Sequence, residues 1–364
     1  MKFISEYRGS EATEAVAKAI RREVRRSYSF MEVCGGHTAA IHRFGIPSLL
    51  PPEINLLSGP GCPVCVTPVS YINRAVTLSL ESESIITTFG DLIRVPGTNT
   101  SLEQTKAAGA DIRIVISALD AVALAAANPG KKVVFLGIGF ETTAPGTAAA
   151  IIRASEKGIK NFFVLSGHKI MPPAMEAIIH DGTAIDGFIC PGHVAAITGS
   201  SVFDFIPGRY GLGCVVSGFE PVDIMLSILM LVKQVNNSAP ACEIQYSRVV
   251  TREGNLKARE IMERVFLTED SEWRGIGKIN TSGLGIRDAW KDHDALSLLR
   301  GLQPGEEGEE NRFCLCSEIL RGRRRPSDCR LFAKTCTPEN PEGACMVSSE
   351  GACNAYYRFK RDAV

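Results

Sequence analysis

Short apolar runs alternate with helical segments through most of this 364-residue chain, and this alternation constrains the fold more than any other feature. The runs are apolar on both faces, which is typical of strands in a parallel sheet covered by helices on both sides. The pattern therefore predicts an α/β protein. The expected helices are 11–27, 68–80, 117–127, 172–180 and 221–235. The expected strands are 54–57, 84–89, 112–116, 133–138, 162–165, 187–189, 214–216 and 244–246.

The alternation restarts near residue 160, so we expect two similar parallel-sheet α/β domains. Their openings resemble each other, LLSG at 56–59 and VLSG at 164–167, and each is followed by a proline and a helix. After residue 270 the chain becomes rich in glycine and then in cysteine, which indicates a small loop- and helix-rich domain that depends on a metal for folding. The expected domains are 1–160, 161–270 and 271–364.

Charge and hydropathy argue against two classes of partner. Forty basic side chains offset forty acidic ones, and broad nucleic-acid binding needs an excess of positive charge. The longest strongly apolar stretch, 224–232, is far shorter than the ~18 residues of a transmembrane helix. The sequence also begins without an apolar signal region. We expect no nucleic-acid or membrane partner and a cytoplasmic location.

The chain contains twelve cysteines, of which six follow residue 313. Structural disulfides are the weaker explanation, because the chain is long enough to bury a core and lacks a signal peptide. Cys190, Cys214 and Cys242 lie in or beside apolar runs, so we interpret them as buried, inert thiols. The others indicate metal or redox chemistry.

Cys62 and Cys65 form a CPVC motif between an expected strand and an expected helix. The amino end of a helix favours the thiolate, so a pair in this context suits disulfide exchange or transient metal binding. The alternative is half of a structural zinc site, which needs a second pair, and the sequence contains no second CxxC.

Cys34 and His37 lie three residues apart in the motif CGGHT. A soft thiolate beside an imidazole suits iron, zinc or copper, and the two glycines allow a ligand to approach the backbone. A cysteine–histidine nucleophile pair and a buried thiol beside a structural histidine stay open as alternatives.

Polar residues also follow other expected strands, at the edge where parallel sheets carry function. Each could equally be a cap, a surface pair or a structural residue, and no complete phosphate or dinucleotide fingerprint accompanies them. These residues are Asp91, Arg94, Glu141, His168 and His193.

The C-terminal cysteines exceed the four thiols that a zinc ion or a [4Fe–4S] cluster needs, which leaves a pair for redox chemistry. No histidine lies among them, so a Cys/His zinc finger is excluded, whereas a Cys₄ zinc site stays open. We favour an iron–sulfur cluster. The six cysteines are Cys314, Cys316, Cys329, Cys336, Cys345 and Cys353.

Seven motifs occur in an order that resembles the HypD family of [NiFe]-hydrogenase maturation proteins, from about residue 30 to the C-terminus. They are CGGHT at 34–38, GPGCPVC at 59–65, TFGDLIRVPG at 88–97, GFETT at 139–143, PGHV at 191–194, GFEP at 218–221 and CMVSSEGAC at 345–353. The resemblance implies two α/β domains of similar topology and a [4Fe–4S] domain.

The resemblance also implies a redox-active assembly scaffold rather than a conventional turnover enzyme. In that family the protein forms a stable complex with HypC, and the two hold one iron ion while it acquires two cyanides and one carbon monoxide. HypF and HypE make the cyanide, HypE delivers it in a transient contact, and HypC carries the Fe(CN)₂CO group to the hydrogenase large subunit.

Residue roles follow from the same resemblance. Cys34 is the implied iron ligand, paired with an N-terminal cysteine of HypC, and His37 orients or ligates. Cys62 and Cys65 match a redox couple. The implied cluster ligands are Cys314, Cys329, Cys336 and Cys353, with Cys316 and Cys345 as a neighbouring dithiol. Two other interpretations are an iron–sulfur thiol–disulfide oxidoreductase similar to ferredoxin:thioredoxin reductase, and a structural zinc protein.

Overall fold

Two parallel sheets organise the protein in the computed structural model, which describes residues 7–302 and 311–359. Sheet A has the order β2-β1-β7-β8-β9, and sheet B has the order β4-β3-β5-β6. The strands of sheet A are β1 (Tyr28–Glu32), β2 (Ile54–Ser58), β7 (Gly187–Pro191), β8 (Gly213–Ser217) and β9 (Cys242–Ile244). Those of sheet B are β3 (Ser84–Thr88), β4 (Ile112–Ile114), β5 (Lys132–Gly139) and β6 (Phe162–His168). The predicted α/β class with parallel sheets is confirmed.

Helices fill the connections between the parallel strands, and further helices lie outside these connections. They are α1 (Ser10–Glu23), α2 (Gly35–Arg43), α3 (Ile46–Leu49), α4 (Val69–Ser79), α5 (Leu102–Ala107), α6 (Ala118–Ala127), α7 (Ala144–Glu156), α8 (Met171–His180), α9 (Gly192–Thr198), α10 (Phe205–Tyr210), α11 (Pro221–Asn236), α12 (Leu256–Val265), α13 (Cys316–Leu320), α14 (Ala344–Val347) and α15 (Ala352–Phe359). Short 3₁₀ helices lie at η2 (Gly90–Arg94), η3 (Ser200–Phe203), η4 (Asp288–His293), η5 (Ala295–Leu299) and η6 (Pro326–Asp328). No helix in the described part of the chain is long and apolar enough to span a bilayer.

The sheets are discontinuous in sequence and divide the chain differently from the expected domains. β1 and β2 lie in one sheet with β7, β8 and β9, although the expected boundary at residue 160 places these segments in different domains. The expected boundary at residue 160 separates β5 from β6, which pair along their whole common length. Apolar periodicity indicates that a strand is buried but not which neighbour buries it, so it could not reveal this interleaving.

The expected boundary at residue 270 falls inside an antiparallel hairpin, β10 (Phe266–Trp273) and β11 (Gly277–Ile286). The hairpin was not predicted, because most of β10 is polar and exposed. It packs on sheet B, where the Ser166 hydroxyl donates to the Leu284 carbonyl at 2.6 Å. The hairpin therefore belongs with sheet B rather than with the cysteine-rich segment.

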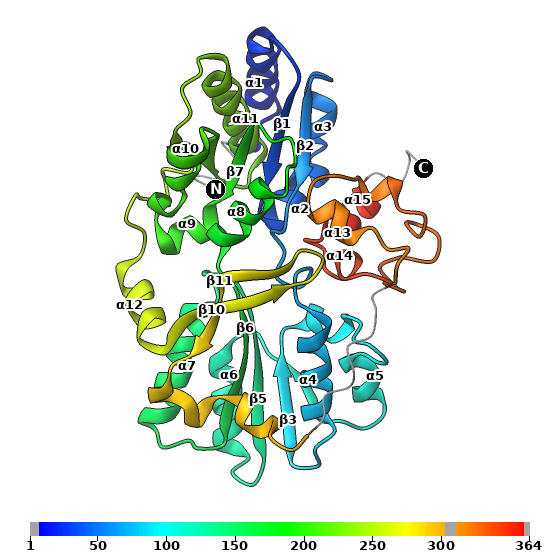
Figure 1. The fold of residues 1–364 in the computed structure, drawn as a ribbon, viewed down its shortest axis with the longest axis vertical. Coiled ribbons are helices and arrows are strands. Elements are labelled where there is room, and N and C mark those ends of the chain that lie inside the picture. The colour runs from blue at the N-terminus through cyan, green and yellow to red at the C-terminus, as the bar shows by residue number, and fades with distance from the viewer. Residues whose placement is uncertain (1–6, 303–310, 360–364) are drawn as a thin grey trace.

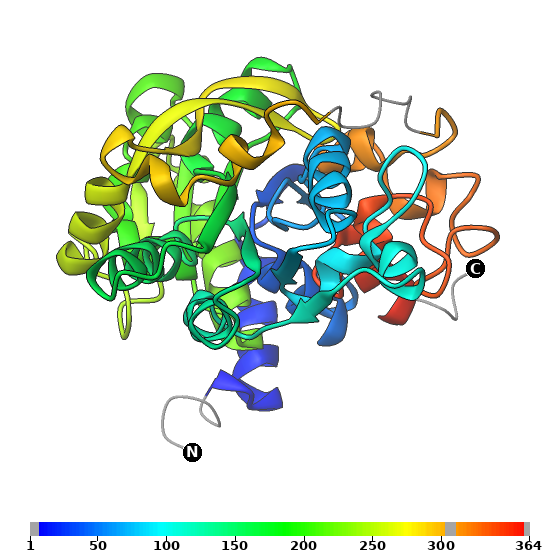
Figure 2. The same ribbon diagram turned by 90° about the horizontal axis from the view of Figure 1, so that it is seen from below.

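The carboxyl ends of the two sheets face the middle of the molecule: Figure 1 shows the arrow of β1 pointing down and that of β3 pointing up. The C-terminal segment from residue 311, orange and red in Figures 1 and 2, lies at one side of this middle region. Its helix α15 packs on α2 of sheet A, and α14 packs on η2 of sheet B. The loops that follow the strands of both sheets therefore meet the cysteine-rich segment.

Candidate functional site

Cys34 lies at the carboxyl edge of sheet A, directly before α2. The register pairs Glu32 of β1 with Ser58 of β2, so the loops after these strands lie side by side. The Gly35 N–H donates to the Gly61 carbonyl at 2.9 Å, and a Cβ built at Gly61 would overlap the Cys34 backbone. Glycine at position 61 is thus what allows the CPVC loop to lie against Cys34.

The CPVC loop connects this edge to the C-terminal segment. Cys62 and Cys65 are both buried and form a hydrogen-bonded thiol pair. Cys65 also contacts the Cys345 thiol, and a Cβ at Gly351 would lie 3.0 Å from the Cys65 sulfur. Thiols from two distant parts of the sequence are therefore in direct contact.

Cys345 lies at the centre of a cluster of cysteine side chains in the C-terminal segment. It forms hydrogen bonds with Cys316, Cys353 and Cys65, and these lower the pKa of the Cys345 thiol despite its burial. Burial and the bonds to Cys345 and Cys62 raise the pKa of Cys65. Cys345 is therefore the member of this cluster that loses its thiol proton most easily, because three neighbouring thiols stabilise its thiolate.

The donor set of the C-terminal segment fits an iron–sulfur cluster in kind, since buried thiolates are its ligands. Cys314 contacts Cys316, and a Cβ at Gly343 would lie 2.6 Å from the Cys314 sulfur and 2.7 Å from the Cys316 sulfur. Only glycine leaves room for two thiols at this backbone position. Charge interactions also connect Cys336 with Cys314 and Cys316.

The thiols implied as cluster ligands and those implied as a neighbouring dithiol lie together in the C-terminal segment. Cys316 and Cys345, expected as the separate dithiol, are in contact with the expected ligand Cys353. Cys329, also expected as a ligand, donates its thiol hydrogen to the Phe313 carbonyl at 3.7 Å. Within residues 7–302 and 311–359, no three Cys, His, Asp or Glu side chains are already arranged around a metal position.

The acidic side chains of Glu32 and Glu350 lie near Cys34 and affect the pKa of its thiol. Burial raises the pKa of the half-buried Cys34 thiol to about 12, with smaller contributions from Glu350 and Glu32. The Cys34 N–H donates to Glu32 at 3.0 Å, and the Thr38 hydroxyl donates to the other carboxyl oxygen. Burial raises the pKa of Glu32 to about 8. The metal-free Cys34 is therefore a neutral thiol, and a bound cation would have to displace its proton.

His37 is buried beside Cys34 but its ring is already engaged. Its Nε2 donates to the Gly218 carbonyl at 2.9 Å, and its ring stacks on Phe219 at 4.5 Å. Phe219 stacks in turn on His193 at 3.9 Å. Burial lowers the pKa of His37 to about 4, so the imidazole is neutral at pH 7. Among the described residues, its buried Nδ1 has no hydrogen-bond partner, and this atom carries the free lone pair.

Arg94 joins the C-terminal segment to sheet B. Its guanidinium donates to the carbonyls of Pro338 and Val347 at 3.0 Å and 2.9 Å. The sequence left a surface pair open for Arg94, and the charged groups of Arg94 and Asp91 are 4.0 Å apart. The carbonyl bonds show that Arg94 is a structural anchor.

Two other strand-end residues belong to sheet B and its helices. His168 bonds the Thr147 hydroxyl at 2.9 Å, and Glu141 accepts from the Met171 N–H at 2.9 Å. These partners support the structural interpretation of both residues.

The three cysteines assigned to the core lie on adjacent strands of sheet A. Cys190 and Cys214 are buried and Cys242 is half-buried. Cys214 is hydrogen-bonded to both others and is paired in register with Cys242. These three cysteines therefore form a second cluster, within sheet A.

Sequence reasoning missed Glu32, Phe219 and Glu350 as neighbours of Cys34. Glu32 is an acidic residue inside an apolar run, which is an available signal, and the same run, β1, was not assigned as a strand. Phe219 occurs in the GFEP motif but carries no titratable group. Glu350 reaches Gly35 only through the packing of the C-terminal segment, which no local pattern encodes.

Comparison with known proteins agrees with this arrangement of motifs. A family model, HypD, described as "Hydrogenase formation hypA family", matches residues 11–360. The chain belongs to the HypD family. It is 45% identical to the hydrogenase maturation factor HypD2 of Bradyrhizobium diazoefficiens over 99% of this chain and 97% of the relative.

Other members of the family show the same extent of similarity. The hydrogenase maturation factor HypD of Cupriavidus necator is 45% identical over 99% of this chain and 98% of its own length. That of Azotobacter vinelandii is 44% identical over 99% and 97%. The similarity thus includes both sheets and the cysteine-rich segment.

Proposed function

We propose that this protein is a hydrogenase maturation factor that serves, with HypC, as the scaffold for assembling the Fe(CN)₂CO group of [NiFe]-hydrogenase. The observation that carries the proposal is the continuous series of contacts from Cys34 through the CPVC loop to Cys345. In this proposal Cys34 binds the iron cargo, cyanide arrives from HypE, and HypC passes the finished group to the hydrogenase large subunit.

The surroundings of Cys34 support a binding role rather than nucleophilic catalysis. A cysteine nucleophile needs a base or a lowered thiol pKa, whereas burial raises the pKa of Cys34 and the His37 Nε2 is bonded to a carbonyl. The Nδ1 of His37, which has no partner in the described part of the chain, suits a second ligand or an acceptor for the displaced proton.

The thiol contacts support a supply of electrons. Cyanide and carbon monoxide favour low-spin ferrous iron, so the cargo must stay reduced during assembly. Cys62 and Cys65 would act as the redox couple beside the iron, in contact with Cys345. A [4Fe–4S] cluster, when bound by thiols of the C-terminal segment, would supply one-electron chemistry. We propose Cys314, Cys336 and Cys353 as ligands, and Cys329 as a fourth that must turn away from Phe313.

The test is infrared spectroscopy on protein purified with HypC in the absence of oxygen. Cys34→Ala should abolish the metal-bound cyanide bands while iron and acid-labile sulfide of the C-terminal segment persist. Cys242→Ala, which removes a half-buried thiol of sheet A, is the matched control and should keep the bands. Cyanide bands that persist in Cys34→Ala would refute the proposal.

An iron–sulfur thiol–disulfide oxidoreductase is the second candidate, because the Cys65–Cys345 contact also suits electron transfer to a protein disulfide. Repeated turnover of a disulfide substrate would favour this enzyme, whereas a stoichiometric reaction would favour the scaffold. A colourless protein with zinc and no acid-labile sulfide would instead support a structural zinc site.

A further inference from the structure

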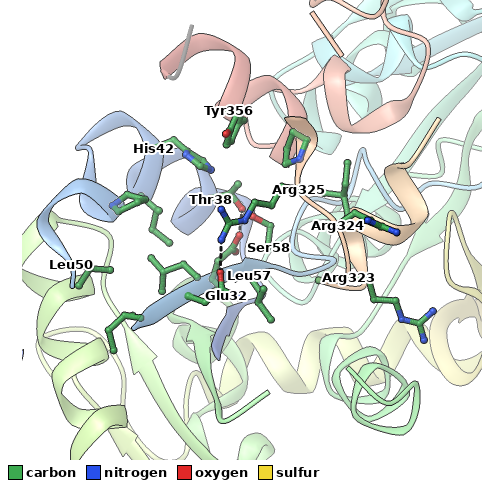
Figure 3. Close-up of a pocket in the computed structure, with 18 of the residues that line it drawn as sticks. Glu32, Thr38, His42, Leu50, Leu57, Ser58, Arg323, Arg324, Arg325 and Tyr356 are labelled. Carbon is green, nitrogen blue, oxygen red and sulfur yellow. Dashed lines mark hydrogen bonds between the residues drawn. The ribbon is translucent and has the colours of Figure 1, made fainter. Parts of the chain in front are cut away.

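A groove of about 680 Å³ runs along the outer edge of sheet A (Figure 3). All residues of β2, Ile54–Ser58, line it, although successive side chains of a strand point to opposite faces. The groove therefore follows the edge of the strand rather than one face of the sheet. Among the described strands β2 pairs only with β1, so every second residue of β2 lacks a ladder partner on its outer side.

The two walls of the groove differ in chemistry. The side of α2 and α3 is mainly apolar, with Ile41, Pro47 and Leu50 beside the polar Thr38 and His42. The opposite wall carries the consecutive arginines Arg323–Arg325 together with one acidic residue, Asp328, so its net charge is positive. This positive charge is local, because the chain as a whole has a formal net charge of zero.

The three arginines are engaged to different degrees. Arg325 reaches across the groove and donates to the Asn55 side chain of β2 at 2.9 Å (Figure 3). Arg323 forms an ion pair with Asp181 at 2.9 Å. The side chain of Arg324 is exposed and has no ion pair or hydrogen bond within residues 7–302 and 311–359. Arg324 and Arg325 thus offer guanidinium groups to an anionic ligand.

The strand presents its two faces to these two walls. Arg325 bonds Asn55, and a Cβ at Gly322 would lie 3.4 Å from Leu57, so the face of positions 55 and 57 lies under the arginine loop. Leu56, on the other face, packs with the apolar core that includes Ile41. A strand laid along β2 would therefore direct alternate side chains to the arginines and to the apolar wall.

We propose that the groove binds an extended acidic segment of a partner protein, which adds a strand to sheet A beside β2. Backbone hydrogen bonds to the free edge supply affinity, and alternate side chains supply specificity. Carboxylates on one face meet Arg324 and Arg325 in charge-assisted hydrogen bonds, while apolar side chains on the other face cover the α2–α3 wall. The five residues of β2 span about 16 Å, so the bound segment has about five or six residues.

This proposal is independent of metal chemistry at Cys34, but the two sites are adjacent. Glu32 and Thr38 both line the groove, and Glu32 accepts the hydrogen bond from the Cys34 N–H. A partner held in the groove is thus positioned beside the loop that carries Cys34.

The test uses full-length protein and a fluorescein-labelled peptide of sequence Val-Glu-Val-Glu-Val-Glu, with binding measured by fluorescence anisotropy. We expect saturable binding that weakens as salt concentration rises. Arg324→Glu should raise the dissociation constant about tenfold, because it replaces an attraction by a repulsion. Arg22→Glu, which reverses an exposed arginine on α1, is the matched control and should leave binding unchanged.

Two further probes separate strand addition from simple charge attraction. The same peptide with N-methyl groups on alternate amides keeps its carboxylates but loses backbone donors, and it should bind at least tenfold more weakly. Equal binding of the methylated peptide, effective competition by tripolyphosphate, or equal binding to Arg324→Glu with an unchanged circular dichroism spectrum would overturn the proposal.

Discussion

The thiol of Cys65 is hydrogen-bonded to that of Cys345, which joins the loop after β2 to helix α14 near the C-terminus. The two residues belong to motifs that are distant in sequence and that meet where the carboxyl edges of both sheets converge. Cys65 could therefore form a disulfide with either of two buried cysteines that contact it, Cys62 or Cys345.

We expect oxidised glutathione to generate a disulfide at Cys65 in the wild type, because Cys62 and Cys345 both contact this thiol. Cys65→Ser should abolish that disulfide. Alkylation of the remaining thiols under denaturing conditions, followed by peptide mass mapping, measures the bond and identifies its partner. Cys242→Ser is the control and should leave this bond intact. Formation of the same amount of disulfide in both variants would show that Cys65 is not its member.

Gly61→Ala should lower the free energy of unfolding by about 1–3 kcal/mol, because the new methyl group overlaps the Cys34 backbone. Gly146→Ala is a matched control in α7, where a Cβ meets nothing within 4 Å, and it should be neutral or stabilising by up to about 1 kcal/mol. Urea unfolding of the two variants measures the difference. Equal stabilities would mean that the CPVC loop can move away from Cys34 without cost.

Ionisation of the buried Glu141 should lower the free energy of unfolding as pH rises from about 4.5 to about 7. Burial raises the pKa of its carboxyl to about 7 in the folded state, so in this range the folded state holds a proton that the unfolded state has lost. The stability is fully present below the ordinary pKa and is lost as pH rises through 7, by an amount on the order of 3 kcal/mol.

Glu141→Gln should therefore flatten the dependence of the free energy of unfolding on pH, measured with urea at pH 5 and pH 8. Glu14→Gln, on the exposed side of α1, serves as the control and should keep the wild-type slope. An unchanged slope in Glu141→Gln would indicate that the buried carboxyl does not take up this proton.

Arg94→Ala should loosen the C-terminal segment, because two charge-assisted hydrogen bonds to the carbonyls of Pro338 and Val347 are lost. Each such bond contributes about 1.5–3 kcal/mol. Losing this stabilisation makes local opening more frequent, so amide exchange near residues 338–347 should accelerate by tenfold or more. Hydrogen exchange with mass spectrometry measures this effect. Arg22→Ala should leave these peptides unchanged, and equal exchange in both variants would contradict the anchoring role.

Local patterns predicted most of the regular structure. The expected strands at 54–57 and 133–138 lie within β2 and β5, and the expected helix at 221–235 coincides with α11. The strand expected at 244–246 lies two residues too late, since β9 is Cys242–Ile244. β1 was not assigned as a strand, although its residues include the apolar Phe30 and Met31. Glu32 is the last residue of this strand, and its buried carboxyl is stabilised by its contacts with Thr38 and Cys34.

The sequence by itself determined the α/β class, the cysteine-bearing motifs and the family, because apolar periodicity and motif spacing are local properties. Only the tertiary structure decided that β1 and β2 join β7–β9, that Cys65 meets Cys345, and that arginines from the C-terminal segment border the free edge of β2. These relationships depend on which distant segments pack together. That choice arises from side-chain complementarity across the whole core, and no short stretch of sequence contains it.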